Sequence, residues 1–188
     1  MASLNSTLKQ AQPPTSQAVG SCVRGLYPAA QVAVAPAERF DAAITIATFA
    51  NPKLQLLFRY WQARRTGRSL PRRSDIDVID LQACLGHLIV IDVGAEAHSL
   101  TYRLFGTRIS AALGFDPTGF DLMQAGLAED DPMLRPYRTA AKLRAPVYCV
   151  NRMTSPNWDR RWERLVLPLS RDDQAVTQLL IGGFLLQS

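Results

Sequence analysis

The segment 52–67 carries apolar residues at helical spacing. One face of it holds four apolar side chains at positions i, i+3, i+4 and i+7: Leu54, Leu57, Phe58 and Trp61. Asn51 suits an N-cap and Pro52 suits the first helical position. Gly67 stands where a glycine commonly closes a helix. The pattern therefore predicts a helix over residues 52–67 with one continuous apolar face.

Two strands follow further along the chain. Residues 87–93 form a run rich in β-branched residues, and apolar and polar side chains alternate over residues 100–105. The turn at 94–99 lets these two strands pair as an antiparallel hairpin. Three more strands are predicted near the C-terminus, at residues 147–150, 161–169 and 176–186.

Helices are predicted between and before these strands, at residues 75–85, 107–113 and 130–143. Pro136 lies inside the last one and is expected to kink it or delay its start. Two strands, a helical middle and three strands make an α+β order. This order predicts one five-stranded antiparallel sheet with helices on one face, preceded by an N-terminal helical extension.

The chain divides into three parts by composition. Residues 1–37 are rich in Ala, Gln, Ser, Thr and Pro without a sustained period, which predicts a poorly ordered or loosely docked arm. Residues 38–73 are expected to hold the N-terminal helices, including a short one within 37–50. Residues 74–188 are expected to form the α+β domain.

Five short motifs occur in a fixed order. They are Tyr60-Trp61, Leu-Pro-Arg-Arg-Ser-Asp-Ile-Asp at 70–77, Asp92-Val93, Tyr-Arg-Leu-Phe-Gly-Thr at 102–107 and Asp-Pro-Thr-Gly at 116–119. Together they resemble the PAS domain family, in particular a bacterial group of small, often stand-alone PAS proteins, the PAS_5 group. The resemblance covers residues 51–186. The sequence departs from the pattern at Val78, where the family usually has a second proline, and residues 1–37 have no counterpart.

The resemblance implies a non-enzymatic sensor that binds a small molecule or a protein partner and signals to a separate protein. Candidate pocket residues between sheet and helices are Tyr102, Leu104, Ile109, Leu113, Met123, Leu165, Leu167 and Leu180. The alternative is that these side chains simply fill the core. Arg103 and Arg108 flank Gly106-Thr107 and are candidates to hold an anionic ligand. Alternatively, Arg103 pairs with a nearby carboxylate such as Asp75, Asp77 or Asp92.

Neither of the two common cofactors of PAS proteins is implied. Flavin photochemistry in that superfamily uses a cysteine in an Asn-Cys-Arg-Phe-Leu-Gln-like helix, whereas Cys149 lies in a predicted strand. Haem binding needs an axial histidine on the helix before the last three strands, and the segment 130–143 contains none.

The helix at 52–67 is the expected route for the signal. Its apolar face, formed by Leu54, Leu57, Phe58 and Trp61, is predicted to be the interface with a partner and a homodimer contact.

The net charge of +5 comes mainly from one segment. Residues 51–73 contain seven basic residues and no acidic residue, whereas residues 74–188 contain eleven basic and fourteen acidic residues. A rival hypothesis is therefore binding of nucleic acid or a membrane surface through residues 53–73. Nucleic acid is disfavoured, because Phe58 and Trp61 have the spacing of packing residues rather than of a base-stacking platform.

Other classes of function have little support. Cys22, Cys84 and Cys149 are odd in number and far apart, which indicates no disulfide framework and favours a reducing cytoplasm. No apolar run is long enough for a membrane span. His87 and His98 are the two histidines, and neither lies in a nucleophile or metal-ligand motif. A second rival, a small-molecule enzyme of undetected type, requires a pocket with convergent polar groups.

Overall fold

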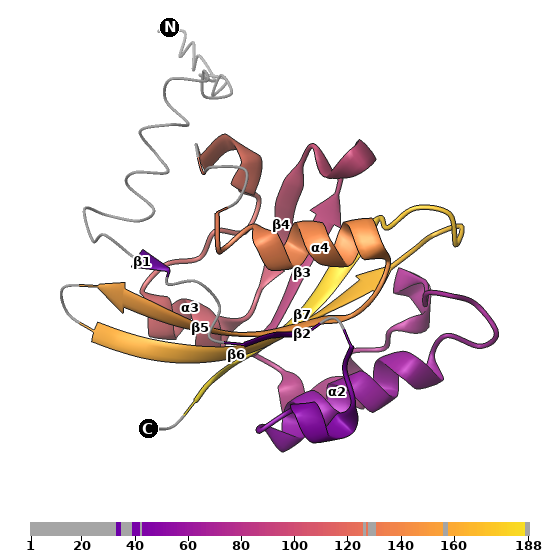
Figure 1. Ribbon diagram of the computed structural model, residues 1–188, viewed down its shortest axis with the longest axis horizontal. Helices are drawn as coiled ribbons and strands as arrows, with labels where there is room; N and C mark the ends of the chain where they lie inside the picture. The colour runs from indigo at the N-terminus through magenta and orange to yellow at the C-terminus, as the bar shows by residue number, and fades with distance from the viewer. Residues whose placement is uncertain are drawn as a thin grey trace, which may run out of the picture.

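The computed structural model shows an antiparallel β-sheet with helices on both of its faces (Figure 1). It describes residues 33–34, 39–41, 43–125, 127, 131–155 and 158–186. Within these residues the sheet has seven strands: β1 (Ala33–Val34), β2 (Arg39–Asp41), β3 (Leu88–Val93), β4 (Leu100–Phe105), β5 (Val147–Ser155), β6 (Trp158–Leu169) and β7 (Gln178–Leu185). The helices are α2 (Pro52–Ala63), α3 (Thr107–Leu113) and α4 (Arg135–Leu143), with short 3-10 segments η1 (Ile46–Thr48), η2 (Arg73–Asp75), η3 (Ile79–Cys84), η4 (Ala95–Ala97) and η5 (Leu122–Ala125).

The five predicted strands form the body of the sheet. They lie in the order β5-β6-β7-β3-β4, and every neighbouring pair is antiparallel. The predicted β3–β4 hairpin is confirmed, with Ile89 opposite Phe105 and Val93 opposite Leu100. The α+β prediction with a five-stranded antiparallel sheet is therefore confirmed.

The helix predicted within residues 37–50 is wrong. Residues 39–41 form β2, which pairs with β5, and β1 pairs with β5 further along, so both extend the sheet beyond its predicted edge. Among the residues of this segment that the structure describes, only η1 is helical. An edge strand presents unpaired N–H and C=O groups, and pairing with them outweighs a weak local helix propensity. The arm predicted over 1–37 otherwise lies outside the described residues.

The helix predicted at 52–67 begins as expected and ends early. The Asn51 side chain caps α2 by accepting a hydrogen bond from the Lys53 N–H at 2.9 Å. The helix ends at Ala63, and Gly67, with φ of +82°, lies in the turn beyond it.

Two other helices differ from the sequence prediction in form. The helix predicted at 75–85 is replaced by η2 and η3, because the backbone is extended at Ile76 and leaves helical geometry again at Leu81. Pro136 does delay α4, which begins at Arg135 rather than near residue 130, so the proline sits in the first turn where its missing N–H does no harm.

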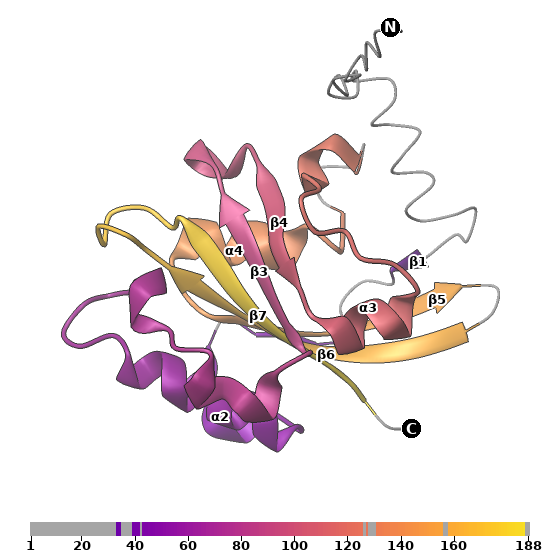
Figure 2. The same cartoon turned by 180° about the vertical axis from the view of Figure 1, so that it is seen from behind.

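The two faces of the sheet are covered by different helices. Added Cβ atoms at the neighbouring residues Gly182 and Gly183 would meet Leu57 of α2 and Ile109 of α3, respectively. Because successive residues of a strand point to opposite faces, α2 and α3 lie on opposite sides. We call the side under α2 the outer face and the side under α3 and α4 the inner face. Figures 1 and 2 show α4 and α2 on the two sides of the sheet.

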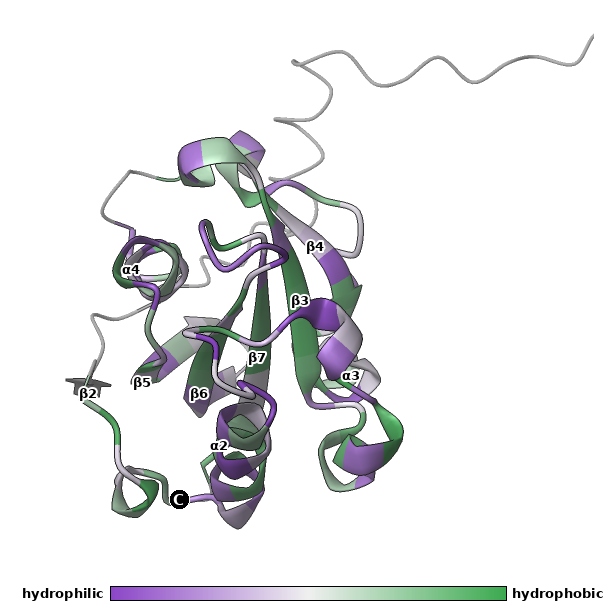
Figure 3. Cartoon of the chain, turned by 90° about the vertical axis from the view of Figure 1, so that its right-hand side faces the viewer, coloured by the Kyte–Doolittle hydropathy of each residue, from purple (hydrophilic) through white to green (hydrophobic). Residues whose placement is uncertain are grey.

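This arrangement agrees with the predicted set of helices on one face plus an N-terminal extension. The extension is not a separate unit, since α2 packs on the sheet through side chains buried in the common core. Figure 3 shows the hydrophobic strands β3 and β7 between the helical layers. The division of the chain at residues 37 and 73 stays a prediction.

The close approach of α2 to the sheet gives a stability prediction. Gly182→Ala would place a Cβ atom 2.7 Å from Leu57 Cδ2 and 2.8 Å from Leu54 Cδ2, and both leucines are fully buried. We expect the free energy of unfolding to fall by about 1–3 kcal/mol, the usual effect of overpacking a core. Gly183→Ala is the matched control, because its Cβ would lie 3.4 Å from Ile109 Cδ1, an ordinary contact. Urea unfolding of both variants tests this, and equal losses would contradict the packing of α2 on the outer face.

Candidate functional site

The sequence-predicted pocket residues do not line one pocket. Tyr102, Ile109 and Leu113 line a cavity on the inner face. The others lie elsewhere: Leu165, Leu167 and Leu180 are buried on the outer face, Leu104 is 46% exposed, and Met123 lies beside α4 at another surface depression. The prediction grouped them because alternation along a strand shows that two faces exist but not which helix covers each face.

The inner-face cavity lies between the sheet, α3 and α4. Its volume is about 40 Å³. About 10–15 Å³ holds one water molecule, so there is room for a few waters or for a small organic group. The lining residues are Ile89, Tyr102, Phe105, Ile109, Leu113, Met133, Tyr137, Met153, Trp162, Arg164 and Gly183.

Arg164 is the most unusual member of this lining. Its side chain lies on β6 and the residue is only 7% exposed. Nη2 donates to Asn151 Oδ1 at 2.7 Å, and Nη1 donates to Tyr137 Oη at 3.2 Å. The guanidinium also lies 5.7 Å from the centre of the Tyr137 ring. Its Nε is buried and has no hydrogen-bond partner.

No carboxylate among the described residues forms an ion pair with Arg164. Its neighbour across the strand pair is Cys149. Burial raises the pKa of the Cys149 thiol, so this group stays protonated at neutral pH and supplies no negative charge. Arginine itself keeps its charge inside proteins. The cavity is therefore lined by a buried positive charge whose partners are neutral groups.

Trp162 places a second free donor at the same cavity. It lies two residues before Arg164 on β6, so both side chains point to the inner face. The residue is 3% exposed, and its Nε1 is buried without a hydrogen-bond partner. A buried unpaired donor costs about 1–3 kcal/mol. Two such donors on one small cavity can both bind an acceptor group placed between the sheet and α4.

The sequence analysis missed Arg164 and Trp162. A signal was present, because the apolar stretch that forms the end of β6 is preceded by Trp162, Glu163 and Arg164. Charged residues are rarely buried without partners. Because successive residues of a strand point to opposite faces, Glu163 and Arg164 indicate that each face of the sheet carries a polar contact at this point of β6.

Glu163 occupies the outer face directly behind Arg164. It is fully buried, and its carboxylate accepts hydrogen bonds from the Ala50 N–H at 2.7 Å and the Asn51 N–H at 3.0 Å. The Tyr148 hydroxyl donates to the same carboxylate at 3.0 Å. Because Asn51 caps α2, Glu163 holds the start of that helix. Successive residues of one strand thus contact the inner cavity and the start of α2.

Arg103 and Arg108 do not reach the cavity. The Arg103 side chain is 72% exposed, and its Nη1 lies 4.0 Å from Asp92 Oδ2. Asp92 is thus the carboxylate that pairs with Arg103, one of the three that the sequence suggested. Arg108 is also exposed. Both side chains face solvent outside the inner-face cavity, so they are not members of that pocket, and an anionic ligand held between them stays a prediction.

The predicted interface residues belong to the core. Leu54, Leu57, Phe58 and Trp61 are 0–5% exposed, and Trp61 Nε1 donates to the Pro168 carbonyl at 2.9 Å. This corrects the prediction that they form a partner interface, because the apolar face of α2 packs on the sheet of its own chain. Exposed apolar side chains occur instead around an outer groove of about 190 Å³ between η3 and β4, whose exposed apolar members are Val78, Leu85 and Leu104.

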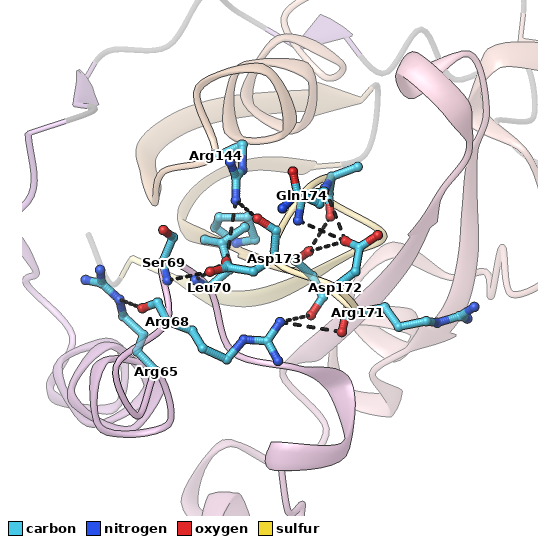
Figure 4. Close-up of polar contacts among 12 residues, drawn as sticks. Arg65, Arg68, Ser69, Leu70, Arg144, Arg171, Asp172, Asp173 and Gln174 are labelled. Carbon is cyan, nitrogen blue, oxygen red and sulfur yellow. Dashed lines mark hydrogen bonds and ion pairs between the residues drawn. The ribbon is translucent and has the colours of Figure 1, made fainter.

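The arginines of the basic segment make contacts within the chain. Arg64 forms an ion pair with Asp80 at 2.5 Å, and the Arg65 guanidinium lies 5.7 Å from the centre of the Trp61 ring. Arg68 Nη2 donates to the carbonyls of Ser170 and Arg171, both at 3.4 Å. The two Arg68 contacts fasten the loop after α2 to the β6–β7 loop (Figure 4). They give the basic segment a structural role.

Asp173 is the centre of this loop contact. Its carboxylate accepts hydrogen bonds from the Ser69 and Leu70 N–H groups, each at 3.1 Å, and Arg144 Nη2 lies 3.4 Å from Oδ1 (Figure 4). The hydrogen bond from the Ser69 N–H, with that from Leu70 and the nearby arginines, lowers the pKa of the Asp173 carboxyl. Its charged form therefore ties residues 69–70 to the β6–β7 loop.

The lowered pKa of Asp173 sets the direction of a pH effect. A carboxylate with a lowered pKa in the folded state stabilises the fold above its unfolded-state pKa, about 3.9, and this contribution is lost as the pH falls through the folded-state pKa. We expect Asp173→Asn to lower the Tm at pH 7 and the gap from the wild type to narrow below about pH 4. The control is Asp116→Asn, whose carboxylate binds Thr118 in its own turn. A gap that stays constant or widens in acid would contradict the assignment.

Groups for other chemistry are sparse in the described part of the chain. There, no three metal-ligating side chains come together. The His87 ring stacks on Phe184, with ring centres 4.4 Å apart, and burial lowers the His87 pKa. His98 lies in the β3–β4 turn. Across the same residues, no helix is long and apolar enough to cross a bilayer.

Comparison with known proteins gives a family match. A family model described as "PAS domain" matches residues 49–185, which is more than half of the chain. The matched region begins just before α2 and contains α2, the five main strands, α3 and α4. No curated protein matches the chain significantly.

Proposed function

The chain belongs to the PAS domain family of sensory and regulatory modules, and we propose that it is a non-enzymatic sensor. In this proposal a small molecule binds in the inner-face cavity, and α2 passes the signal to a separate protein. The observation that carries it is the cavity itself, where Arg164 and Trp162 present unpaired buried donors. A chain that only needed a stable core would gain by replacing both donors with apolar groups.

Strand β6 offers a physical route for the signal. Arg164 contacts the inner cavity, and Glu163 holds the Ala50 and Asn51 N–H groups at the start of α2. A ligand that draws Arg164 toward itself shifts β6, and this alters the geometry at Glu163. The bound and free states then differ in the position or stability of α2, which is a population shift.

Compound screening by thermal shift tests the ligand-binding part of this proposal. A cavity ligand raises the Tm of the wild type, since it binds the folded state selectively. It should not raise the Tm of Leu113→Trp, in which a larger side chain fills the cavity. Leu143→Trp is the matched control, because Leu143 is exposed at the end of α4. If no compound stabilises the wild type, or if Leu113→Trp is stabilised equally, the proposal fails.

A second copy of the chain is the proposed occupant of the outer groove. Its floor is apolar, and Val78, Leu85 and Leu104 remain exposed at it. Residues of both signs surround it, with Arg73 in its lining and Asp77 next to Val78. In a two-fold dimer each surface meets its own copy, so a patch that carries both charges can complement itself.

Leu104→Asp is expected to convert this dimer to a monomer. A carboxylate in the buried centre of an apolar contact loses its hydration without gaining a partner. Light scattering should give twice the chain mass of 20.8 kDa for the wild type and the single-chain mass for the variant. Leu143→Asp, an exposed leucine outside the groove, should leave the mass unchanged. A monomeric wild type, or a dimeric Leu104→Asp variant, would refute the dimer.

A further inference from the structure

The two unpaired donors belong to residues that line the same inner-face cavity, and they differ in kind. Arg164 Nε belongs to a charged group, and Trp162 Nε1 belongs to a neutral one. Both residues are more than nine-tenths buried. Neither donor has an acceptor among the described residues, so a bound molecule with two acceptor atoms would satisfy both.

The charge around Arg164 selects the sign of that molecule. Its two hydrogen-bond partners, Asn151 Oδ1 and Tyr137 Oη, are neutral groups. Cys149 beside it is protonated, because burial raises the pKa of its thiol. A buried charge is normally paired, and the described residues provide no carboxylate for it. Water molecules in the cavity would accept hydrogen bonds from the unpaired donors but would not balance the positive charge of Arg164.

The rest of the lining limits the size and polarity of the molecule. The cavity of about 40 Å³ is walled by apolar side chains such as Ile109, Leu113 and Met133. A carboxylate carries one negative charge on two acceptor oxygens, one for each of the two unpaired donors. A short hydrocarbon tail suits the apolar wall. A tetrahedral dianion would add charge and polar oxygens that face no donor.

We propose that the ligand of the cavity is a small aliphatic monocarboxylate. One carboxylate oxygen accepts from Arg164 Nε and the other accepts from Trp162 Nε1, while the alkyl tail lies against Ile109 and Leu113. This inference rests on the proposed function, since it names the ligand class of the same cavity.

Calorimetric titration of the full chain with propionate and propionamide tests the class directly. The two probes have nearly the same shape and differ in charge. We expect propionate to bind at least about tenfold more tightly, a difference of about 1.4 kcal/mol. Titrations with acetate and butyrate set limits on the length of the alkyl tail. A titration with sulfate tests whether any anion is enough for binding. Equal binding of propionamide, or tighter binding of sulfate, would overturn the proposal.

Two variants assign the contacts. Arg164→Gln removes the charge and is expected to weaken propionate binding at least about tenfold, whereas Trp162→Phe keeps an aromatic ring and removes the N–H, with a smaller loss. Arg103→Gln is the matched control, because Arg103 is exposed and outside the cavity. If Arg164→Gln does not fold, Trp162→Phe and the comparison of propionate with propionamide still test the proposed carboxylate contacts. Unchanged propionate affinity in Trp162→Phe, or in a folded Arg164→Gln, would overturn the assignment.

The outcome separates this proposal from the one it rests on. If carboxylates do not bind while a neutral compound stabilises the wild type but not Leu113→Trp, the ligand class is wrong and the sensor proposal stands. If no compound of any class binds, both fall.

Discussion

Glu163→Ala is expected to lower the free energy of unfolding by about 3–5 kcal/mol. The variant removes the carboxylate that accepts three hydrogen bonds, from the Ala50 and Asn51 N–H groups and from the Tyr148 hydroxyl. Each buried donor left unpaired costs about 1–3 kcal/mol, and the three losses do not add fully because the groups are neighbours. Urea unfolding followed by circular dichroism gives the value.

Glu163→Gln and Glu96→Ala are the controls for this prediction. Glu163→Gln keeps one acceptor oxygen in nearly the same place and should lose less than Glu163→Ala. Glu96 is exposed in the β3–β4 turn, and its replacement should change stability by about 0.5 kcal/mol or less. A loss below about 1 kcal/mol for Glu163→Ala would mean that the carboxylate does not hold the start of α2.

Trp61→Ala lowers the free energy of unfolding by about 3–5 kcal/mol, the range for removing a large aromatic side chain from a core. Trp61 is 2% exposed, and its Nε1 donates to the Pro168 carbonyl. The variant therefore creates a cavity between α2 and the sheet and leaves a carbonyl unpaired. Chemical denaturation measures the loss, and light scattering on the same sample measures the oligomeric mass.

The two readouts separate a core role from an interface role for Trp61. A core residue lowers stability strongly and leaves the mass of the folded protein unchanged. An interface residue would change the mass and leave the stability of the single chain nearly intact. Leu56→Ala, on the exposed side of α2, should lower stability by about 0.5 kcal/mol or less.

Periodicity in the sequence was enough to predict the main elements of the fold. The β3–β4 hairpin and the three C-terminal strands follow from alternation and β-branched runs, and α2 follows from its apolar face and its Asn51 cap. Strand β2 was not predictable from periodicity, because its three residues adopt a strand conformation only through pairing with β5. Local patterns do not record a partner that lies more than a hundred residues away.

The sequence also showed that α2 has an apolar face but not what covers it. The same pattern fits a partner interface and a helix packed on its own sheet. Gly182 carries the missing information, because a position without a Cβ allows Leu54 and Leu57 to approach the strand. A glycine inside a strand indicates that another element of the protein packs closely against the strand there, but the sequence does not say which element it is.

For the candidate site, the strand assignment was correct, but the predicted pocket residues are divided between the two faces of the sheet. Tyr102, Ile109 and Leu113 lie at the inner cavity, whereas Leu165 and Leu167 point to the opposite face. Apolar residues fill both faces of a sheet covered on both sides, so their hydrophobicity does not identify a pocket. The proposed ligand site rests instead on Arg164 and Trp162, whose buried donors have no partner among the described residues.

The central claim is that occupancy of the inner cavity is transmitted across β6 to the start of α2. Hydrogen–deuterium exchange of the full chain, with and without saturating propionate, tests it most directly. The wild type should show a changed exchange rate at the Ala50 and Asn51 amides, which bind Glu163, and the change should be smaller in Glu163→Gln. Binding of propionate with protection confined to the inner-face elements α3 and α4, and with unaltered exchange at residues 50–51, would contradict the claim.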